Sequence, residues 1–280
     1  NKKINNFKKK ITVEGDKSLS IRWALLASQA FGKSRAYNLL NSEDVLNTLS
    51  CLKKLGVKIN LKKNYCEIKG NGINSFNYKK NLTLNVGNSA TLGRLILALL
   101  IRSPHKIKLI GDRSLSRRDF SRVIEPLKKF GVNFYPKNKR TLPLYILGTD
   151  FLRPIKYYES KGSAQVKSSV MLAALNTPGT TKIVAHKSRD HTEILFKYLK
   201  IPIKIKKTKT RHSLYSGKWS YELVINKVKF PEELEIVEQL GIKVHYLKDI
   251  VKDMLKGGQL IKSASGVDLV NLMLLGKGNN

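Results

Sequence analysis

The most restrictive feature of this 280-residue sequence is a unit of two helices and four strands that recurs three times. Apolar runs with helical spacing alternate with short runs rich in β-branched residues, which predicts the order strand, helix, strand, helix, strand, strand. The repetition is plainest where "LKKLGVKI" at 52–59 returns as "LKKFGVNF" at 127–134. A unit of this kind cannot bury its own apolar face, so we expect the three units to share one core.

The two helices of each unit differ in kind. The first is apolar nearly all round, which predicts a helix buried on every side, and these helices begin near Lys17, Asn88 and Ser163. The second is amphipathic, at 42–56, 114–131 and 188–200. Ser116 with Asp119, and Asp190 with Glu193, have the spacing of capping boxes at the last two. We expect the strands at 11–13, 35–39, 57–61, 65–70, 82–87, 105–112, 132–136, 142–148, 155–160, 180–186, 201–207 and 220–225.

Positive side chains stand where these apolar helices begin. Units related by pseudo-threefold symmetry would hold the three buried helices parallel, with their N-termini together. A helix N-terminus behaves like roughly +0.5 of a charge, so Lys17 and Arg22 are unexpected there, as is Arg94 on the second buried helix. Capping accounts for the small polar residues at these ends. It does not account for the cations, which instead predict a site for a phosphate or carboxylate.

The charge balance leaves a second class of function open. Lysine and arginine total 53 against 20 acids, a net charge of +33, which is typical of nucleic-acid-binding proteins. The lysines are spread along the chain, without a basic block beyond residues 1–10 and without interleaved aromatics for base stacking. We therefore expect no nucleic acid partner. A basic RNA-binding protein remains the alternative to that expectation.

Location and cofactors follow from weaker signals. The two cysteines, Cys51 and Cys66, lack metal-ligand spacing, so we expect no metal, no disulfide framework and a reducing cytoplasm. The N-terminal stretch lacks the apolar segment of a signal peptide. The longest apolar run, 95–101, is too short to span a bilayer, so no membrane association is expected.

Six motifs resemble one family. They are "GDKSLSIR", "EDVLNTLSCLKKLGVKI", "GNSATLGR", "GDRSLSRRDFSRVIEPLKKFGV", "SAQVKSSVMLAALNTPG" and "SRDHTE", and they cover roughly residues 11–200 in order. The chain is similar to the EPSP synthases (3-phosphoshikimate 1-carboxyvinyltransferases) among the enolpyruvyl transferases. The resemblance implies an inside-out α/β barrel of three repeats around three buried parallel helices. It also implies transfer of the enolpyruvyl group of phosphoenolpyruvate to the 5-hydroxyl of shikimate 3-phosphate, without a cofactor, by a monomer acting on small molecules.

The resemblance also assigns the substrate contacts. Lys17 would touch both substrates and is the candidate for proton transfer. The residues implied for shikimate 3-phosphate are Lys17, Ser18, Arg22, Ser163, Ala164, Gln165 and Arg189. Those implied for phosphoenolpyruvate are Lys17, Asn88, Ala90, Thr91, Arg118 and Gln165.

Two positions indicate a branch of the family. Ala164 stands where many members have a second serine, and Ala90 stands where many have glycine. Both are typical of a branch with glyphosate-tolerant members. The sister transferase acting on UDP-N-acetylglucosamine is the alternative enzyme, and "GDKS…R" with "SAQVKSS" favours the shikimate branch.

The likeness fades after about residue 205. The family's second lobe supplies a catalytic Asp, a Lys–Glu pair and two more arginines, and residues 206–280 match none of those motifs. We expect a segment at 1–14 that reaches toward a second lobe, one lobe of three repeats at 15–225, and a partial or non-family segment at 226–280. Such a truncated transferase is expected to be inactive alone.

Overall fold

The computed structural model describes residues 13–63, 65–208 and 220–225. The chain divides into two compact units, residues 1–227 and 228–280, and all of the described residues lie in the first. The predicted segment at 226–280 lies outside the described residues, as does nearly all of the one at 1–14, and both assignments stay predictions.

The helices alternate between buried and half-exposed along the chain. The described residues form the α-helices α1 (Lys17–Ala27), α2 (Glu43–Lys54), α3 (Ala90–Leu99), α4 (Ser121–Lys129), α5 (Ala164–Leu175) and α6 (His191–Tyr198). The strands are β1 (Phe31–Tyr37), β2 (Lys58–Leu61), β3 (Tyr65–Asn71), β4 (Thr83–Asn85), β5 (Ile107–Ile110), β6 (Asn133–Tyr135), β7 (Leu144–Leu147), β8 (Lys156–Glu159), β9 (Thr181–His186), β10 (Ile203–Thr208) and β11 (Ser220–Ile225).

The three sheets repeat one topology. The second runs β4-β5-β7-β6 and the third β8-β9-β11-β10, each with a parallel first pair and antiparallel pairs after it. The first runs β1-β3-β2, the same order without its leading strand. The strand predicted at 11–13 would fill that place, but residues 11 and 12 lie outside the described residues and Val13 is not in a strand. This shared order confirms the predicted repeat.

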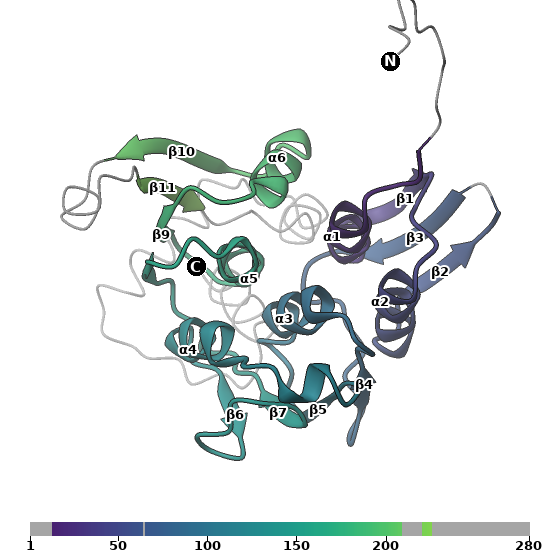
Figure 1. Ribbon diagram of the computed structural model, residues 1–280, viewed down its shortest axis with the longest axis horizontal. Helices are drawn as coiled ribbons and strands as arrows, with labels where there is room; N and C mark the ends of the chain where they lie inside the picture. Colours follow the sequence, from purple (N-terminus) through teal and green to yellow (C-terminus); the bar gives the residue numbers. More distant parts are fainter. Residues whose placement is uncertain (1–12, 64, 209–219, 226–280) are drawn as a thin grey trace, which may run out of the picture. The chain divides into compact units, whose positions relative to one another are not determined.

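The three buried helices, α1, α3 and α5, lie together with the three sheets around them. Figure 1 views these helices nearly end on. Helix α5 is buried at every position from Val166 to Leu175, since it packs on α3, α4 and the third sheet. Contacts between α3 and α5 advance together along both helices, from Thr91–Gln165 through Arg94–Ser169 to Arg102–Asn176. The two helices are therefore parallel, as predicted.

Two predicted boundaries are wrong for local reasons. Strand β1 begins at Phe31 rather than near 35, and it ends at Tyr37, just before Asn38, whose φ of 55° is left-handed. The helix predicted over 114–131 is a 3₁₀ turn at Leu115–Arg117 followed by α4. The side chains of Asp112 and Asp119 bond the backbone N–H groups of Leu115 and Ser121, and such bonds compete with helix formation.

The two predicted capping boxes are also wrong. Ser116 Oγ donates to Gly111 O instead of capping a helix, and α4 has Phe120 at its N-cap. Asp190 is the N-cap of α6, but its side chain makes no capping hydrogen bond.

Candidate anion site at the buried helix ends

Each buried helix begins with a side-chain cap. Asp16, Ser89 and Ser163 accept from the backbone N–H of Leu19, Leu92 and Val166 at 2.7, 3.3 and 3.4 Å. Each cap satisfies one of the free N–H groups of its helix end. The remaining N–H groups and the helix dipoles stay available to an anion.

The ends of α3 and α5 are joined by Gln165. Its side-chain nitrogen donates to Thr91 Oγ1 at 3.1 Å, and its oxygen accepts from Arg94. Arg94 also donates to the backbone oxygen of Asp119 at 3.2 Å, and its guanidinium lies 5.6 Å from the ring centre of Phe120. The structure thus brings the predicted residues Thr91 and Gln165 into direct contact.

Arg22 is a buried cation held by neutral groups. Only 5% of the residue is exposed. Nε donates to Thr192 Oγ1 at 2.9 Å, Nη1 to Ser18 O at 3.1 Å and Nη2 to Ser168 Oγ at 3.3 Å. No described carboxylate forms an ion pair with it. Burying a charge without a paired countercharge is costly, so the site favours an added anion.

Burial and neighbouring cations weaken the charged form of two arginines. Burial lowers the pKa of Arg22, although the carboxylates of Glu193 and Asp16 oppose that effect and Arg189 adds to it. Burial also lowers the pKa of Arg94, with Arg118 and Arg122 lowering it further. A bound anion would reverse both effects, because an opposite charge favours the protonated form.

Lys17 already has a partner. Its Nζ lies 3.0 Å from Asp44 Oδ2 at the start of α2, and half of its side chain is exposed. Gly15, just before the cap of α1, is packed so closely that a Cβ would lie 2.1 Å from Asn38 O. This close approach fixes where α1 begins, and with it the place of Lys17 and Ser18.

Five other predicted residues, Asn88, Ala90, Arg118, Ala164 and Arg189, make no side-chain hydrogen bond or ion pair among the described contacts. Asn88, Arg118 and Arg189 are exposed, and Ala90 and Ala164 are half-buried. Ser163, besides capping α5, donates its backbone N–H to Glu159 Oε2 at 2.8 Å. Arg118 and Arg189 are nonetheless close enough to Arg94 and Arg22 to lower the pKa of each.

Sequence reasoning missed the groups that hold the cations. Ser168 and Thr192 receive Arg22, and Asp44 pairs with Lys17. Arg94 is among the cations that predict an anion site, but the resemblance assigns it no substrate contact. The signal for Ser168 and Thr192 was their place on helix faces that must be buried, where a hydroxyl needs a partner.

Neither a metal centre nor a membrane span is found in the described part of the chain. Residues 13–63, 65–208 and 220–225 contain no group of three or more His, Cys, Asp and Glu side chains that could hold a metal ion. None of the helices there is long and apolar enough to cross a bilayer.

The fold and these helix ends define a class: an α/β protein of three repeats with cations and amides at the ends of its buried helices. Residues 1–224 match the EPSP synthase (3-phosphoshikimate 1-carboxyvinyltransferase) family, and the chain belongs to it.

Individual relatives agree with that family. The chain is 44% identical over 185 residues to the 3-phosphoshikimate 1-carboxyvinyltransferases of Streptococcus pyogenes serotype M2 (strain MGAS10270) and serotype M1, covering 65% of this chain and 43% of each relative. A solved EPSP synthase from Acinetobacter baumannii superposes with a TM-score of 0.69 and 31% identity, over 80% of this chain and 48% of that one. The inside-out α/β fold is thereby confirmed. The chain spans less than half the length of these relatives.

Proposed function

We propose that this chain is the shikimate-3-phosphate-binding lobe of an enzyme that transfers the enolpyruvyl group of phosphoenolpyruvate to the 5-hydroxyl of shikimate 3-phosphate, releasing phosphate. The observation that carries the proposal is Arg22, buried with three neutral hydrogen-bond partners and no ion pair among the described residues. A guanidinium binds phosphate and carboxylate groups through two N–H groups at once, and shikimate 3-phosphate supplies such a phosphate.

In this proposal the phosphate of shikimate 3-phosphate lies between α1 and α5. Arg22 and Arg189 face it, and both are cations whose charges repel each other without an anion between them. The remaining contacts come from the helix ends, through Lys17, Ser18, Ser163, Ala164 and Gln165.

Phosphoenolpyruvate would bind at the neighbouring end of α3. Its anionic groups would face Arg118, Lys17 and one side-chain N–H of Gln165. The other side-chain N–H of Gln165 donates to Thr91, and its oxygen accepts from Arg94. Asn88, Ala90 and Thr91 would form the wall of this pocket at the first turn of α3.

The chemistry suits such a site. Both substrates are polyanions, and the tetrahedral intermediate between them bears two phosphates and a carboxylate. Preorganised cations and N–H groups stabilise that charge more in a partly desolvated site than in water. Lys17 would move the proton, once released from Asp44. We further propose that the enzyme acts in the cytoplasm as a monomer.

This lobe is proposed to bind without turning over. The resemblance assigns the catalytic Asp and the Lys–Glu pair to a lobe whose motifs this chain does not match. General acid–base help is worth about 10²–10⁴-fold, and closure of two lobes over the substrates also contributes.

The test is calorimetric titration of shikimate 3-phosphate into the purified chain, beside an assay of phosphate release with both substrates. We expect binding in the millimolar range and no release above background. Absence of heat at several millimolar ligand contradicts the binding proposal, and release above background contradicts the proposed lack of turnover.

A further inference from the structure

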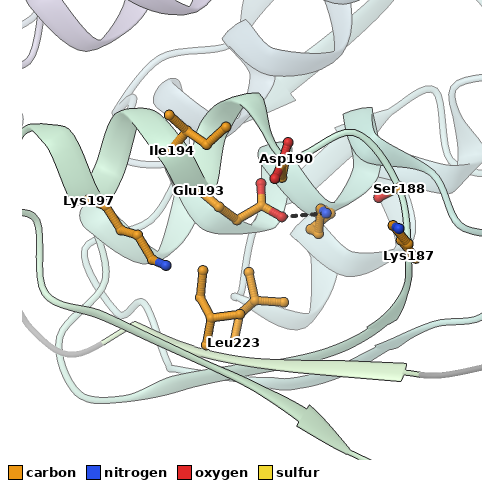
Figure 2. Close-up of a pocket in the computed structure, with 9 residues that line it drawn as sticks. Lys187, Ser188, Asp190, Glu193, Ile194, Lys197 and Leu223 are labelled. Carbon is orange, nitrogen blue, oxygen red and sulfur yellow. Dashed lines mark ion pairs between the residues drawn. The ribbon is translucent and has the colours of Figure 1, made fainter.

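A second polar contact joins α5 to α6 immediately beside the arginine site. Lys167 on α5 forms an ion pair with Glu193 Oε1 on α6, and both side chains are more than nine-tenths buried. Both residues line a cavity of about 210 Å³ whose apolar lining includes Ile194 and Leu223. Figure 2 shows Glu193 and these two apolar side chains. The resemblance assigns no role to either residue.

The ion pair adjoins the two hydroxyls that receive Arg22. Lys167 is followed by Ser168 on α5, and Glu193 is preceded by Thr192 on α6. Thr192 Oγ1 donates to Ser168 Oγ at 2.7 Å. Since successive helical residues point about 100° apart, the hydroxyl pair faces α1 while the ion pair faces the cavity. Two adjacent residues on each helix thus make two cross-links.

A hydroxyl pair alone fixes this geometry poorly. A serine or threonine hydroxyl rotates to suit its neighbours, so the hydroxyls can follow a shift of either helix. A buried lysine–carboxylate pair cannot, because separating its charges in a partly dry interior is costly. Glu193 in addition favours the charged guanidinium of Arg22, and its effect on the Arg22 pKa exceeds that of Asp16.

We propose that Lys167 and Glu193 are positioning residues for the phosphate site: their ion pair sets α6 against α5 so that Ser168 and Thr192 hold the Arg22 guanidinium toward the ligand. Arg189, two residues before the first residue of α6, is placed by the same cross-link. The identity of the ligand in this inference rests on the proposed function. The placement of Arg22 rests on the described contacts alone.

The test compares the chain with the double variant Lys167→Met/Glu193→Leu. Apolar replacement of both partners avoids the stranded charge that a single change would leave and often preserves stability. Circular dichroism checks that the variant is folded. Lys197→Met, which removes a lysine from the same cavity without touching the ion pair, is the matched control.

Two readouts separate the inference from the proposed function. The first is hydrogen exchange of the Arg22 Nε–H, assigned in ¹⁵N spectra by its loss in Arg22→Lys. We expect at least tenfold faster exchange in the double variant and no change in Lys197→Met. The second is the affinity for shikimate 3-phosphate, which we expect to fall about tenfold in the double variant.

Each outcome decides one claim. A folded double variant with unchanged Arg22 exchange overturns the positioning role. If exchange accelerates and the affinity does not change, the proposed link to the phosphate site is wrong. If neither chain binds shikimate 3-phosphate but exchange accelerates, the proposed function fails while the positioning of Arg22 stands. If the double variant does not fold, the second variant is Lys167→Arg, which retains the ion pair with Glu193. We then expect the Arg22 Nε–H to exchange at the wild-type rate. A different rate in that folded chain overturns the inference.

Discussion

The guanidinium of Arg94 on α3 donates a hydrogen bond to the side-chain oxygen of Gln165 on α5. Because that oxygen is occupied, the amide nitrogen points the other way and donates to Thr91 Oγ1 at 3.1 Å. The two partners fix the orientation of the amide and leave it one further N–H. This remaining donor stands at the helix end where we propose that both substrates bind.

Gln165→Glu should separate stability from binding. A carboxylate of nearly the same size still accepts from Arg94, and the charge-assisted bond is stronger, so we expect the midpoint of thermal unfolding to hold or rise. The added negative charge opposes an anionic ligand. We expect the affinity for shikimate 3-phosphate to fall at least tenfold, about 1.4 kcal/mol, by titration calorimetry. Unchanged affinity would exclude Gln165 from the site.

Arg22→Met should weaken binding without weakening the fold. Ser168 and Thr192 hydrogen-bond to each other, so removing the guanidinium leaves neither hydroxyl without a partner. The variant also removes a buried charge that lacks an ion pair, which favours the folded state. We expect an equal or higher unfolding midpoint and a binding loss of about 1.5–3 kcal/mol, the range of a hydrogen bond to a charged group.

Arg35→Met is the matched control for that loss. Arg35 is an exposed arginine on β1, paired with Glu67 at 2.6 Å and absent from the proposed site. It should leave the affinity for shikimate 3-phosphate unchanged. Equal losses in both variants would mean that net charge, rather than Arg22, governs binding.

Asp44→Asn should release Lys17 at little cost to stability. The pair Lys17–Asp44 is half exposed on the lysine side, and such pairs contribute about 0–1 kcal/mol. Freed from Asp44, Lys17 can turn to an anion, so we expect a several-fold gain in affinity for phosphoenolpyruvate, measured by titration calorimetry in the presence of shikimate 3-phosphate. A loss of affinity would show that Asp44 holds Lys17 in its binding orientation.

The repeat and its buried helices could be predicted because they depend on local periodicity. The apolar run of α5 has no polar face, which predicts a helix at the centre of the fold. The repeat then predicts that the first helices of the other two units pack beside it. The start of α4 could not be predicted, since it depends on two aspartate side chains that bond backbone N–H groups rather than on propensity.

The arginines on the buried helices can be read from the sequence, but their hydrogen-bond partners cannot. A charge on an apolar helix is visible in sequence, and it singles out Arg22 and Arg94. That Arg22 meets Thr192, 170 residues later, depends on how α6 packs against α1 and α5. No spacing in the sequence encodes such a contact, so only the structure gives it.

The two cysteine thiols should be unreactive in the folded chain. Burial raises the pKa of Cys51 to about 12 and also raises the pKa of Cys66. Cys51 Sγ further donates to Asn85 O at 3.2 Å. Since the thiolate is the nucleophile, we expect no labelling by a disulfide reagent at pH 8 and two thiols labelled in guanidinium chloride. Rapid labelling of the native chain would contradict the burial of α2 against β4.

The same shift predicts how stability varies in alkali. The folded state holds the Cys51 proton more tightly than the unfolded chain, whose thiols ionise near pH 8.5. The stabilisation is therefore complete below about pH 8.5 and is lost as the pH rises from there toward 12. Measured by urea unfolding, the free energy should fall more steeply between pH 8.5 and 10.5 in the wild type than in Cys51→Ala, whose lysines and tyrosines are otherwise identical. Parallel slopes in the two chains would mean that Cys51 ionises as freely in the fold as in the unfolded state.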